Sequence, residues 1–276
     1  LRWYLFGSNQ FGGGVSNAHN GVMAYEHAYQ GVEARKAYFF MGDAMVCMGS
    51  GIKAARTQEV RTSVNQCLAN GEVTYGLSGH TYRLTNNLSD KNIDWAYHDN
   101  VGYIFPQNES VTLRKAKQTG AWRELEVTAS DKPVTKEIFS LWVSHGTTPQ
   151  HEDYCYIIMP DKPLSYFTDK KFENEIKIIV NSEQIQAISN ENKKQYAAVF
   201  YEPGEIRFAE DLVVAVNKKV IIYIEKKDKQ YEIAVADPLY KEQSLQLSMN
   251  GEQINIVFPS GDYSGSSVIK HITEKH

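Results

Sequence analysis

The sequence predicts an all-β protein built from antiparallel hairpins. Short runs rich in Val, Ile, Tyr and Phe recur along the chain, and Gly, Asn and Asp residues separate them. The 276 residues, 42% of them hydrophobic, are enough to bury one large core or two smaller ones. The sequence holds no run of 18 or more apolar residues, so we expect no transmembrane helix.

The same pattern places the individual strands. In chain order, we expect strands at Ala37–Met41, Met45–Met48, Gly102–Phe105, Phe139–Val143, Tyr154–Met159, Ile176–Val180, Tyr196–Tyr201, Leu212–Val216, Val220–Glu225, Tyr231–Ala236 and Ile254–Phe258.

Two hairpins are visible directly. In "KAYFFMGDAMVCMGSGI", residues 36–52, Gly42 and Asp43 mark a tight reversal, and both flanks are apolar on both faces. That pattern is typical of central strands between two layers. In "VIIYIEKKDKQYEIAVAD", residues 220–237, the charged Lys-Lys-Asp-Lys-Gln tip is expected in solvent.

The segment "AARTQEVRTSVNQCLANG", residues 54–71, carries two conflicting signals. Val60, Val64 and Leu68 recur at the four-residue spacing of a helix, and Gly71 closes the run. The Thr and Val residues favour a strand instead. We predict a strand over Thr57–Leu68, because pairing in the folded sheet overrides intermediate local propensities.

A change in composition predicts two domains. Between Tyr166 and Lys194 the polar stretches "FTDKKFENE" and "SNENKKQ" bracket a single apolar strand, and later strands are shorter and more regularly spaced. We place the boundary near residue 182, which gives a larger sandwich over 1–182 and a smaller one over 183–276.

Charge and cysteine content limit the classes of partner and ligand that the sequence favours. The net charge is −4 with both signs interspersed, so nothing favours a nucleic acid or a membrane as a partner. Cys47, Cys67 and Cys155 lack metal-binding spacing and are expected as buried free thiols. We interpret Leu1 as an internal position of a longer parent protein, and removal of a leader would give the same start.

Candidate chemistry is concentrated in "WAYHDNVGYIFP", residues 95–106. Here Tyr103 and His98 are of the right types to abstract a proton from a carbon acid, with Asp99 orienting the imidazole. Alternatively, His98 and Asp99 satisfy backbone groups where a strand begins, and this reading is favoured. His145, between a strand and a turn, is also expected to bond loop backbone.

The remaining motifs are weak. "FGGGVSN", residues 11–17, lacks the Lys-Ser and helix of a phosphate loop and predicts a tight bend or bulge. "HEDY", residues 151–154, lacks the spacing of a zinc motif and is expected as a solvated loop. We therefore assign no catalytic, cofactor-binding or metal-binding residue, and no cofactor.

Several stretches, taken in order, resemble a known family. "GGGVSNAHNGVMAYE", "VEARKAYFFMGDAMVCMGSGI", "WAYHDNVGYIFP", "GAW", "FSLWVSHGTTPQHEDYCYIIMP" and "IQAI" are similar to the middle and C-terminal β domains of the polysaccharide lyases that act on hyaluronan, chondroitin and xanthan. The resemblance covers about residues 11–190. It implies a large antiparallel super-sandwich followed by a small C-terminal β-sandwich.

The resemblance also implies a function. Such lyases cleave acidic polysaccharides by β-elimination outside the cytoplasm, in extracellular or periplasmic space. An N-terminal α/α toroid carries the Asn, His and Tyr that neutralise the uronate and move the C5 proton, so no residue here inherits a catalytic role. Some relatives hold calcium near the stretch similar to "SNAHNGVMAYE". Only Asn17 and Glu26 supply suitable oxygens here, so no metal is carried over.

Three functions are open from the sequence. The first is the scaffold and cleft-wall portion of a glycosaminoglycan lyase, inactive alone. The second is a free-standing carbohydrate-binding module, which needs exposed rings such as Trp3, Trp95 or Trp122 as a stacking platform. The third is a complete small enzyme that uses His98 and Tyr103.

Overall fold

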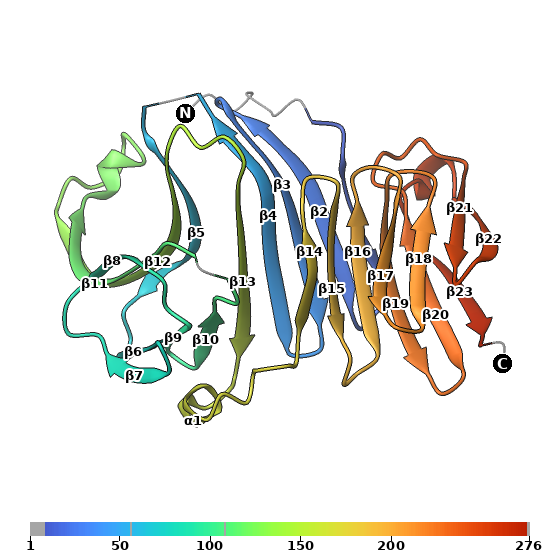
Figure 1. The fold of residues 1–276 in the computed structure, drawn as a ribbon. Coiled ribbons are helices and arrows are strands. Elements are labelled where there is room, and N and C mark those ends of the chain that lie inside the picture. Colours follow the sequence, from blue (N-terminus) through green and yellow to red (C-terminus); the bar gives the residue numbers. More distant parts are fainter. Residues whose placement is uncertain (1–8, 56, 108, 275–276) are drawn as a thin grey trace.

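The computed structural model describes residues 9–55, 57–107 and 109–274, and these form 23 strands in four antiparallel sheets. Figure 1 shows the four sheets side by side as successive layers. The all-β prediction is confirmed, as are two stacked sandwiches. Trp3 lies outside the described residues.

The first sandwich pairs a nine-stranded sheet with a four-stranded one. The nine-stranded sheet has the order β1 (Gly12–Ser16), β2 (Gly21–Tyr29), β3 (Val32–Met41), β4 (Ala44–Ala54), β13 (Glu152–Pro160), β10 (Val101–Ile104), β9 (Trp95–His98), β6 (Val73–Leu77) and β7 (His80–Arg83). The first four-stranded sheet has the order β5 (Glu59–Leu68), β12 (Val134–Thr147), β11 (Val111–Gly120) and β8 (Leu88–Lys91).

The second sandwich is built in the same way. Its six-stranded sheet has the order β14 (Lys177–Asn181), β15 (Ile185–Asn190), β16 (Gln195–Phe200), β19 (Val220–Lys227), β20 (Gln230–Ala236) and β23 (Val268–Thr273). The second four-stranded sheet has the order β17 (Gly204–Ala209), β18 (Leu212–Val216), β21 (Ser244–Met249) and β22 (Glu252–Val257).

Short helical turns complete the chain. They are α1 (Leu164–Thr168), η1 (Trp122–Glu124) and η2 (Gly261–Tyr263). The chain changes sandwich between Pro160 and Lys177, and the predicted division near residue 182 lies just past β14.

Three apolar layers hold the four sheets together. Successive side chains of a strand point to opposite faces, so an inner sheet buries both of its faces. In β4, Val46 and Met48 pack toward the six-stranded sheet, whereas Cys47 packs toward the first four-stranded sheet. The prediction of a central hairpin reversing at Gly42 and Asp43 is confirmed.

The segment with conflicting signals is a strand, as predicted. β5 pairs with β12 along its length, and buried Val60 and Thr62 alternate with exposed Arg61. The helical spacing does not define a buried face, since Leu68 is 61% exposed.

The glycine-rich stretch differs from its prediction. Instead of a bend or bulge, residues 12–16 form the edge strand β1, which pairs with β2 in regular register. Glycine fits closely at Gly13, where an added Cβ would make a tight contact, 3.3 Å from the Cα of Pro238 in the second sandwich. The missing side chain therefore allows the two sandwiches to approach closely.

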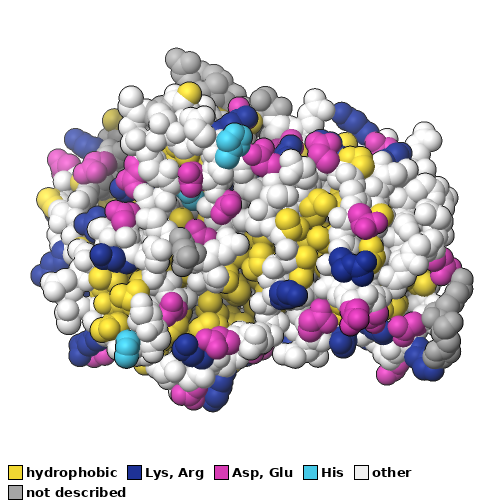
Figure 2. All heavy atoms as spheres, viewed as in Figure 1, with side chains coloured by type: hydrophobic (Ala, Val, Ile, Leu, Met, Phe, Trp, Pro, Cys, Tyr) yellow, Lys and Arg dark blue, Asp and Glu magenta, His cyan; other side chains and the backbone are white. Residues whose placement is uncertain are grey.

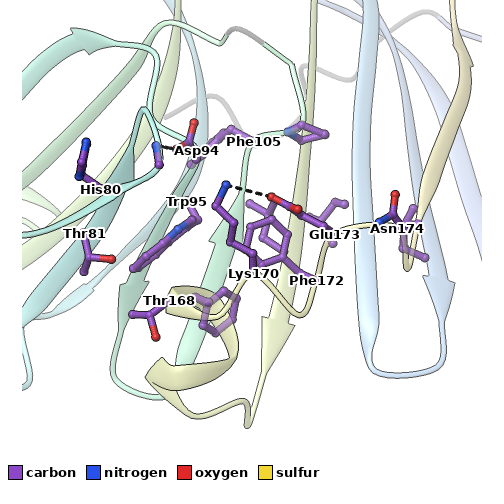
Figure 3. Close-up of a pocket in the computed structure, with 16 residues that line it drawn as sticks. His80, Thr81, Asp94, Trp95, Phe105, Thr168, Lys170, Phe172, Glu173 and Asn174 are labelled. Atoms are coloured by element: carbon purple, nitrogen blue, oxygen red, sulfur yellow. Dashed lines mark hydrogen bonds and ion pairs between the residues drawn. The ribbon is translucent and has the colours of Figure 1, made fainter.

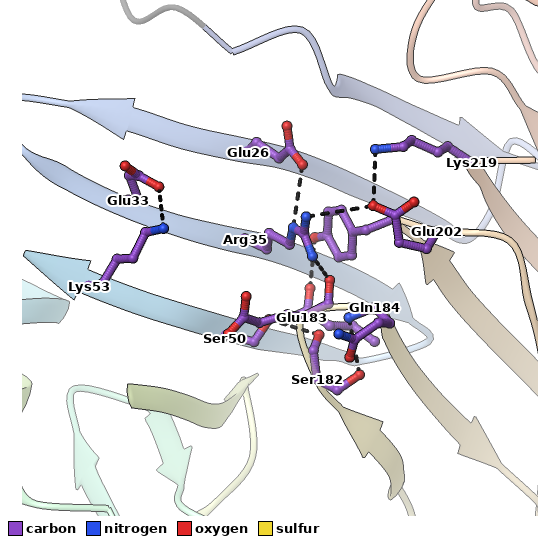
Figure 4. Close-up of polar contacts among 12 residues, drawn as sticks. Glu26, Glu33, Arg35, Ser50, Lys53, Ser182, Glu183, Gln184, Glu202 and Lys219 are labelled. Carbon is purple, nitrogen blue, oxygen red and sulfur yellow. Dashed lines mark hydrogen bonds and ion pairs between the residues drawn. The ribbon is translucent and has the colours of Figure 1, made fainter. Parts of the chain in front are cut away.

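Arg35 is the centre of a polar seam between the sandwiches (Figure 4). Its guanidinium donates to the backbone carbonyl of Glu183 and pairs with Glu26 at 3.4 Å. It also lies 4.0 Å from the carboxylate of Glu202 and 5.2 Å from the centre of the Tyr201 ring. The seam fixes β3 of one sandwich against loops of the other.

The surface carries mixed charge. Figure 2 shows blue and magenta side chains interspersed over this face. All three cysteines are free, and Cys47 and Cys155 are buried as expected, whereas Cys67 is half-buried. In the described part of the chain, we find no helix long and apolar enough to cross a membrane.

Candidate functional site

The His98 and Tyr103 pair is brought together but closed to solvent. β9 and β10 pair as a hairpin, and both side chains point into the layer beneath the first four-stranded sheet, where they contact the Phe139 ring. His98 is 1% exposed and Tyr103 is 2% exposed. A substrate carbon cannot reach either group in this arrangement.

The hydrogen bonds of this pair are structural. The backbone N–H of Asn70 donates to Nε2 of His98 at 3.0 Å, and the amide of Asn65 donates to the Tyr103 hydroxyl. The carboxylate of Asp99 accepts from the Asn70 side chain rather than orienting the imidazole. Burial lowers the pKa of His98 and raises that of Tyr103, so both are neutral near pH 7.

His145 differs in detail from its prediction. It lies inside β12 rather than at a loop, and its Nε2 is 2.8 Å from the hydroxyl of Thr62 in β5. The strand continues past His145 because β5 pairs with it up to Thr147. Burial, with the nearby Lys36 ammonium, lowers the pKa of His145 to about 4.

The "HEDY" stretch is only partly a loop, contrary to the prediction. His151 is exposed and contacts the Glu183 carboxylate at 2.8 Å, but β13 begins at Glu152. Tyr154 is 1% exposed. Pairing with β4, which places Glu152 opposite Ile52, extends the strand back into this stretch.

The two oxygens considered for a cation are separated. The amide of Asn17, in the β1–β2 turn, donates to the carboxylates of Glu225 and Glu232 in the six-stranded sheet, at 3.1 and 2.8 Å. Glu26 pairs with Arg35 instead. Among the described residues, no group of three or more His, Cys, Asp or Glu side chains is placed to hold a metal ion. Asn17 therefore links the sandwiches.

Trp95 and Trp122, the two candidates for a stacking platform that lie in the described part of the chain, do not form one. Trp95 is 3% exposed and packs on Phe167 of α1, with ring centres 5.9 Å apart. Trp122 is 61% exposed, but it stands on η1, in the connection between β11 and β12. These positions give no support to the carbohydrate-binding module.

A cavity of about 460 Å³ lies where α1 and its following loop cover the end of the nine-stranded sheet (Figure 3). Phe167 and Phe172 contribute to an apolar floor, with ring centres 6.1 Å apart. On the rim, Lys170 pairs with Glu173 at 3.3 Å, and Asp94 accepts from the backbone N–H of Gly79 at 3.2 Å.

This α1 cavity suits a small polar ligand above an apolar floor. Lys170 and Glu173 neutralise each other, whereas Asp94 accepts from a backbone N–H and not from a cation, so the charged groups of the rim sum to one negative charge. Sequence reasoning missed the cavity because "FTDKKFENE" reads as a polar connection. The spacing of Phe167 and Phe172 within it, with Ile176 directly after it, was the available signal.

Comparisons with known proteins establish the family. A model of the super-sandwich domain of polysaccharide lyase family 8 matches residues 2–171, and a model of that family's C-terminal β-sandwich domain matches residues 177–246. The chain belongs to polysaccharide lyase family 8. The resemblance stated from the sequence is confirmed.

Two relatives of this family-8 chain are named lyases. It is 31% identical to chondroitinase AC of Pedobacter heparinus, in a match over 96% of this chain and 39% of that protein. It is 24% identical to xanthan lyase of Bacillus sp. strain GL1, over 75% of this chain and 23% of that protein. The chain thus spans no more than 39% of the length of these two relatives.

Solved structures agree in fold. A chondroitinase AC lyase solved in complex with oligosaccharides has a TM-score of 0.89 and 28% identity, and the match covers 96% of this chain and 40% of that chain. A Paenibacillus xanthan lyase has a TM-score of 0.84 at 18% identity, over 97% of this chain and 29% of that chain. The latter likeness concerns the fold alone.

Proposed function

We propose that this family-8 chain is the β-sheet scaffold and cleft wall of a lyase that cleaves uronic-acid-containing polysaccharides by β-elimination. Membership of family 8 and the 31% identity to chondroitinase AC support a lyase of chondroitin or hyaluronan type. Only the names of the relatives indicate which polysaccharide is cleaved, and these names include xanthan lyase as well.

The burial of the His98 and Tyr103 pair is the observation that carries the scaffold role. Abstraction of the C5 proton requires a base within hydrogen-bond reach of the substrate. The tyrosine and histidine that the sequence offered for this task are 2% and 1% exposed, and each already has a bonding partner. We infer that the catalytic groups lie in another part of the whole lyase, an N-terminal toroid.

The proposed substrate determines the location. A long acidic polymer does not cross a lipid bilayer, because its charges would have to leave water. The enzyme must therefore meet the polymer outside the cytoplasm. We propose an extracellular or periplasmic location for the whole lyase.

Substitutions at the buried pair test the scaffold role. In the whole lyase, His98→Gln and Tyr103→Phe should each lower the stability by about 1 kcal/mol, the value of one lost hydrogen bond. Turnover of chondroitin or hyaluronan should stay within a few-fold of wild type. Tyr231→Phe, which changes a buried tyrosine of the six-stranded sheet, is the matched control. A thousandfold loss of turnover at an unchanged melting temperature would show that the pair takes part in catalysis.

A further inference from the structure

A second cavity, of about 390 Å³, opens between β3 and β5, where the nine-stranded sheet extends past the edge of the first four-stranded sheet. Lys36 of β3 lines it. Its strand neighbours on the same face, Ala34 and Tyr38, pack in the layer between these two sheets. The Lys36 side chain therefore points into that layer rather than to open solvent.

Lys36 is a half-buried ammonium without a counter-ion. Among the described residues, no carboxylate lies within 4.0 Å of its Nζ, which instead lies 6.0 Å from the centre of the Tyr154 ring. Lys53, on the adjacent strand β4, differs from Lys36 in both respects: its side chain is exposed, and its ammonium pairs with the Glu33 carboxylate at 2.9 Å. A buried unpaired charge is costly unless something compensates it.

Several other polar groups that line the Lys36 cavity can donate a hydrogen bond or carry a positive charge. His27 comes from β2, Arg61 and Thr62 from β5, and His145 from β12. Burial is the larger cause that lowers the pKa of both histidines, and the Lys36 ammonium lowers it further.

Among the described residues, Glu59 is the one acid of the lining, and it is already engaged. Its carboxylate pairs with Arg61 and accepts from the Ser144 hydroxyl at 2.6 Å. The cavity therefore retains one uncompensated positive charge with hydrogen-bond donors around it. That combination is complementary to an oxyanion.

We propose that the Lys36 cavity binds one oxyanion, the carboxylate or sulfate group of a saccharide, with the Lys36 ammonium as its counter-ion. The anion site stands on the contacts above. Its saccharide source rests on the proposed function, because acidic polysaccharides carry these two groups. The volume is sufficient for a single charged sugar unit and not for a polymer chain.

Sulfate titrations test the anion site. In calorimetry and thermal unfolding, millimolar sodium sulfate should bind wild type saturably and raise its melting temperature, against sodium chloride of equal ionic strength. Lys36→Met keeps the length of the side chain without its charge, and it should weaken sulfate binding at least tenfold. Lys117→Met, an equal charge change at an exposed position on β11, should bind like wild type.

Unchanged sulfate affinity in variants of the Lys36 cavity would contradict the proposed anion site. Equal sulfate affinity in wild type and Lys36→Met would overturn the site. If Lys36→Met does not fold, Arg61→Gln decides: a several-fold weaker affinity supports the site, and an unchanged affinity overturns it.

Competition experiments identify the source of the anion. Glucuronate should compete with sulfate for wild type, whereas glucose should not. If sulfate binds at Lys36 but neither glucuronate nor a sulfated chondroitin disaccharide competes, the saccharide assignment is wrong. The lyase proposal would then stand or fall separately, on the turnover assays.

Discussion

Glu109 is a buried acid of the first sandwich, and its ionisation should lower the stability of the folded protein. Its side chain is 6% exposed, and one carboxylate oxygen accepts from the backbone N–H of Cys155 at 2.7 Å. Burial raises its pKa from the usual 4.5 to about 7, with a further contribution from Asp153. The protonated acid is therefore the form that fits the folded protein best.

The sign of the pH dependence follows from linkage. Between pH 4.5 and 7 the unfolded chain releases the Glu109 proton while the folded chain keeps it. The stability of the folded protein therefore falls as the pH rises through this range, and the loss levels off above pH 7. Glu109→Gln removes the penalty, which is at most about 3 kcal/mol. Chemical denaturation should find the variant more stable than wild type at pH 8 and equal at pH 4.

An exposed acid of β17 provides the control. Glu205→Gln makes the same change of side chain in solvent, so the comparison isolates the effect of the buried position. Parallel pH profiles for wild type and Glu109→Gln would contradict the buried-acid account.

At the scale of elements, glycines in the sheet make room for aromatic rings. An added Cβ at Gly102 of β10 would lie 1.9 Å from the Phe167 ring, and one at Gly49 of β4 would lie 2.1 Å from the Tyr154 ring. α1 therefore docks on the nine-stranded sheet by placing a fully buried Phe167 where a strand lacks a side chain. The same contact forms part of the floor of the α1 cavity.

Gly102→Ala tests this docking. The added methyl group cannot fit without displacing the ring, so the substitution should destabilise the protein by about 1–3 kcal/mol, a typical cost of overpacking. Gly12→Ala is the control, because its added Cβ would make only an ordinary contact at 3.8 Å. Equal denaturation midpoints for the two variants would show that α1 docks in another way.

Sequence patterns predicted strands that are buried on both faces better than strands with an exposed or glycine-rich stretch. Apolar runs such as Val220–Glu225 predicted β19 because this strand is buried on both faces, and its charged tip is exposed at Lys227–Gln230 as expected. β11 escaped prediction because its second half, with Lys117, faces solvent and reads as polar. β1 was not predicted because the role of its glycines depends on contacts with the second sandwich, which the local sequence does not show.

Contacts distant in the sequence decided the candidate site. The sequence placed His98 and Tyr103 in one short stretch, residues 95–106, but their burial depends on Phe139 of β12, which no local pattern relates to them. Lys36 likewise gains its significance from β5, which stops short of covering it. Residue types suggested the chemistry, and only the folded structure showed which groups a ligand can reach.

At the scale of the whole molecule, the two sandwiches share a core. The nine-stranded and six-stranded sheets bury one common apolar layer, to which Phe39 and Val46 contribute from one side and Val199 and Ile221 from the other. A single domain cannot unfold without exposing the partner's half of this layer. The polar seam at Arg35 adds to the same interface.

Calorimetry tests the shared core. We expect one unfolding transition for the chain, with calorimetric and van't Hoff enthalpies in agreement. Arg35→Met should lower its midpoint without splitting it, because the apolar layer remains. Two resolved transitions in wild type would show that the sandwiches behave as independent domains.

The most direct test of the central claim is the activity of the purified chain alone. Incubation with chondroitin, hyaluronan or xanthan should produce none of the ultraviolet absorbance of unsaturated uronate, while an active chondroitinase AC run in parallel does. The scaffold account predicts this because the tyrosine and histidine of β9 and β10 are buried and bonded. Sustained production of unsaturated uronate by the chain, abolished by Tyr103→Phe, would contradict it.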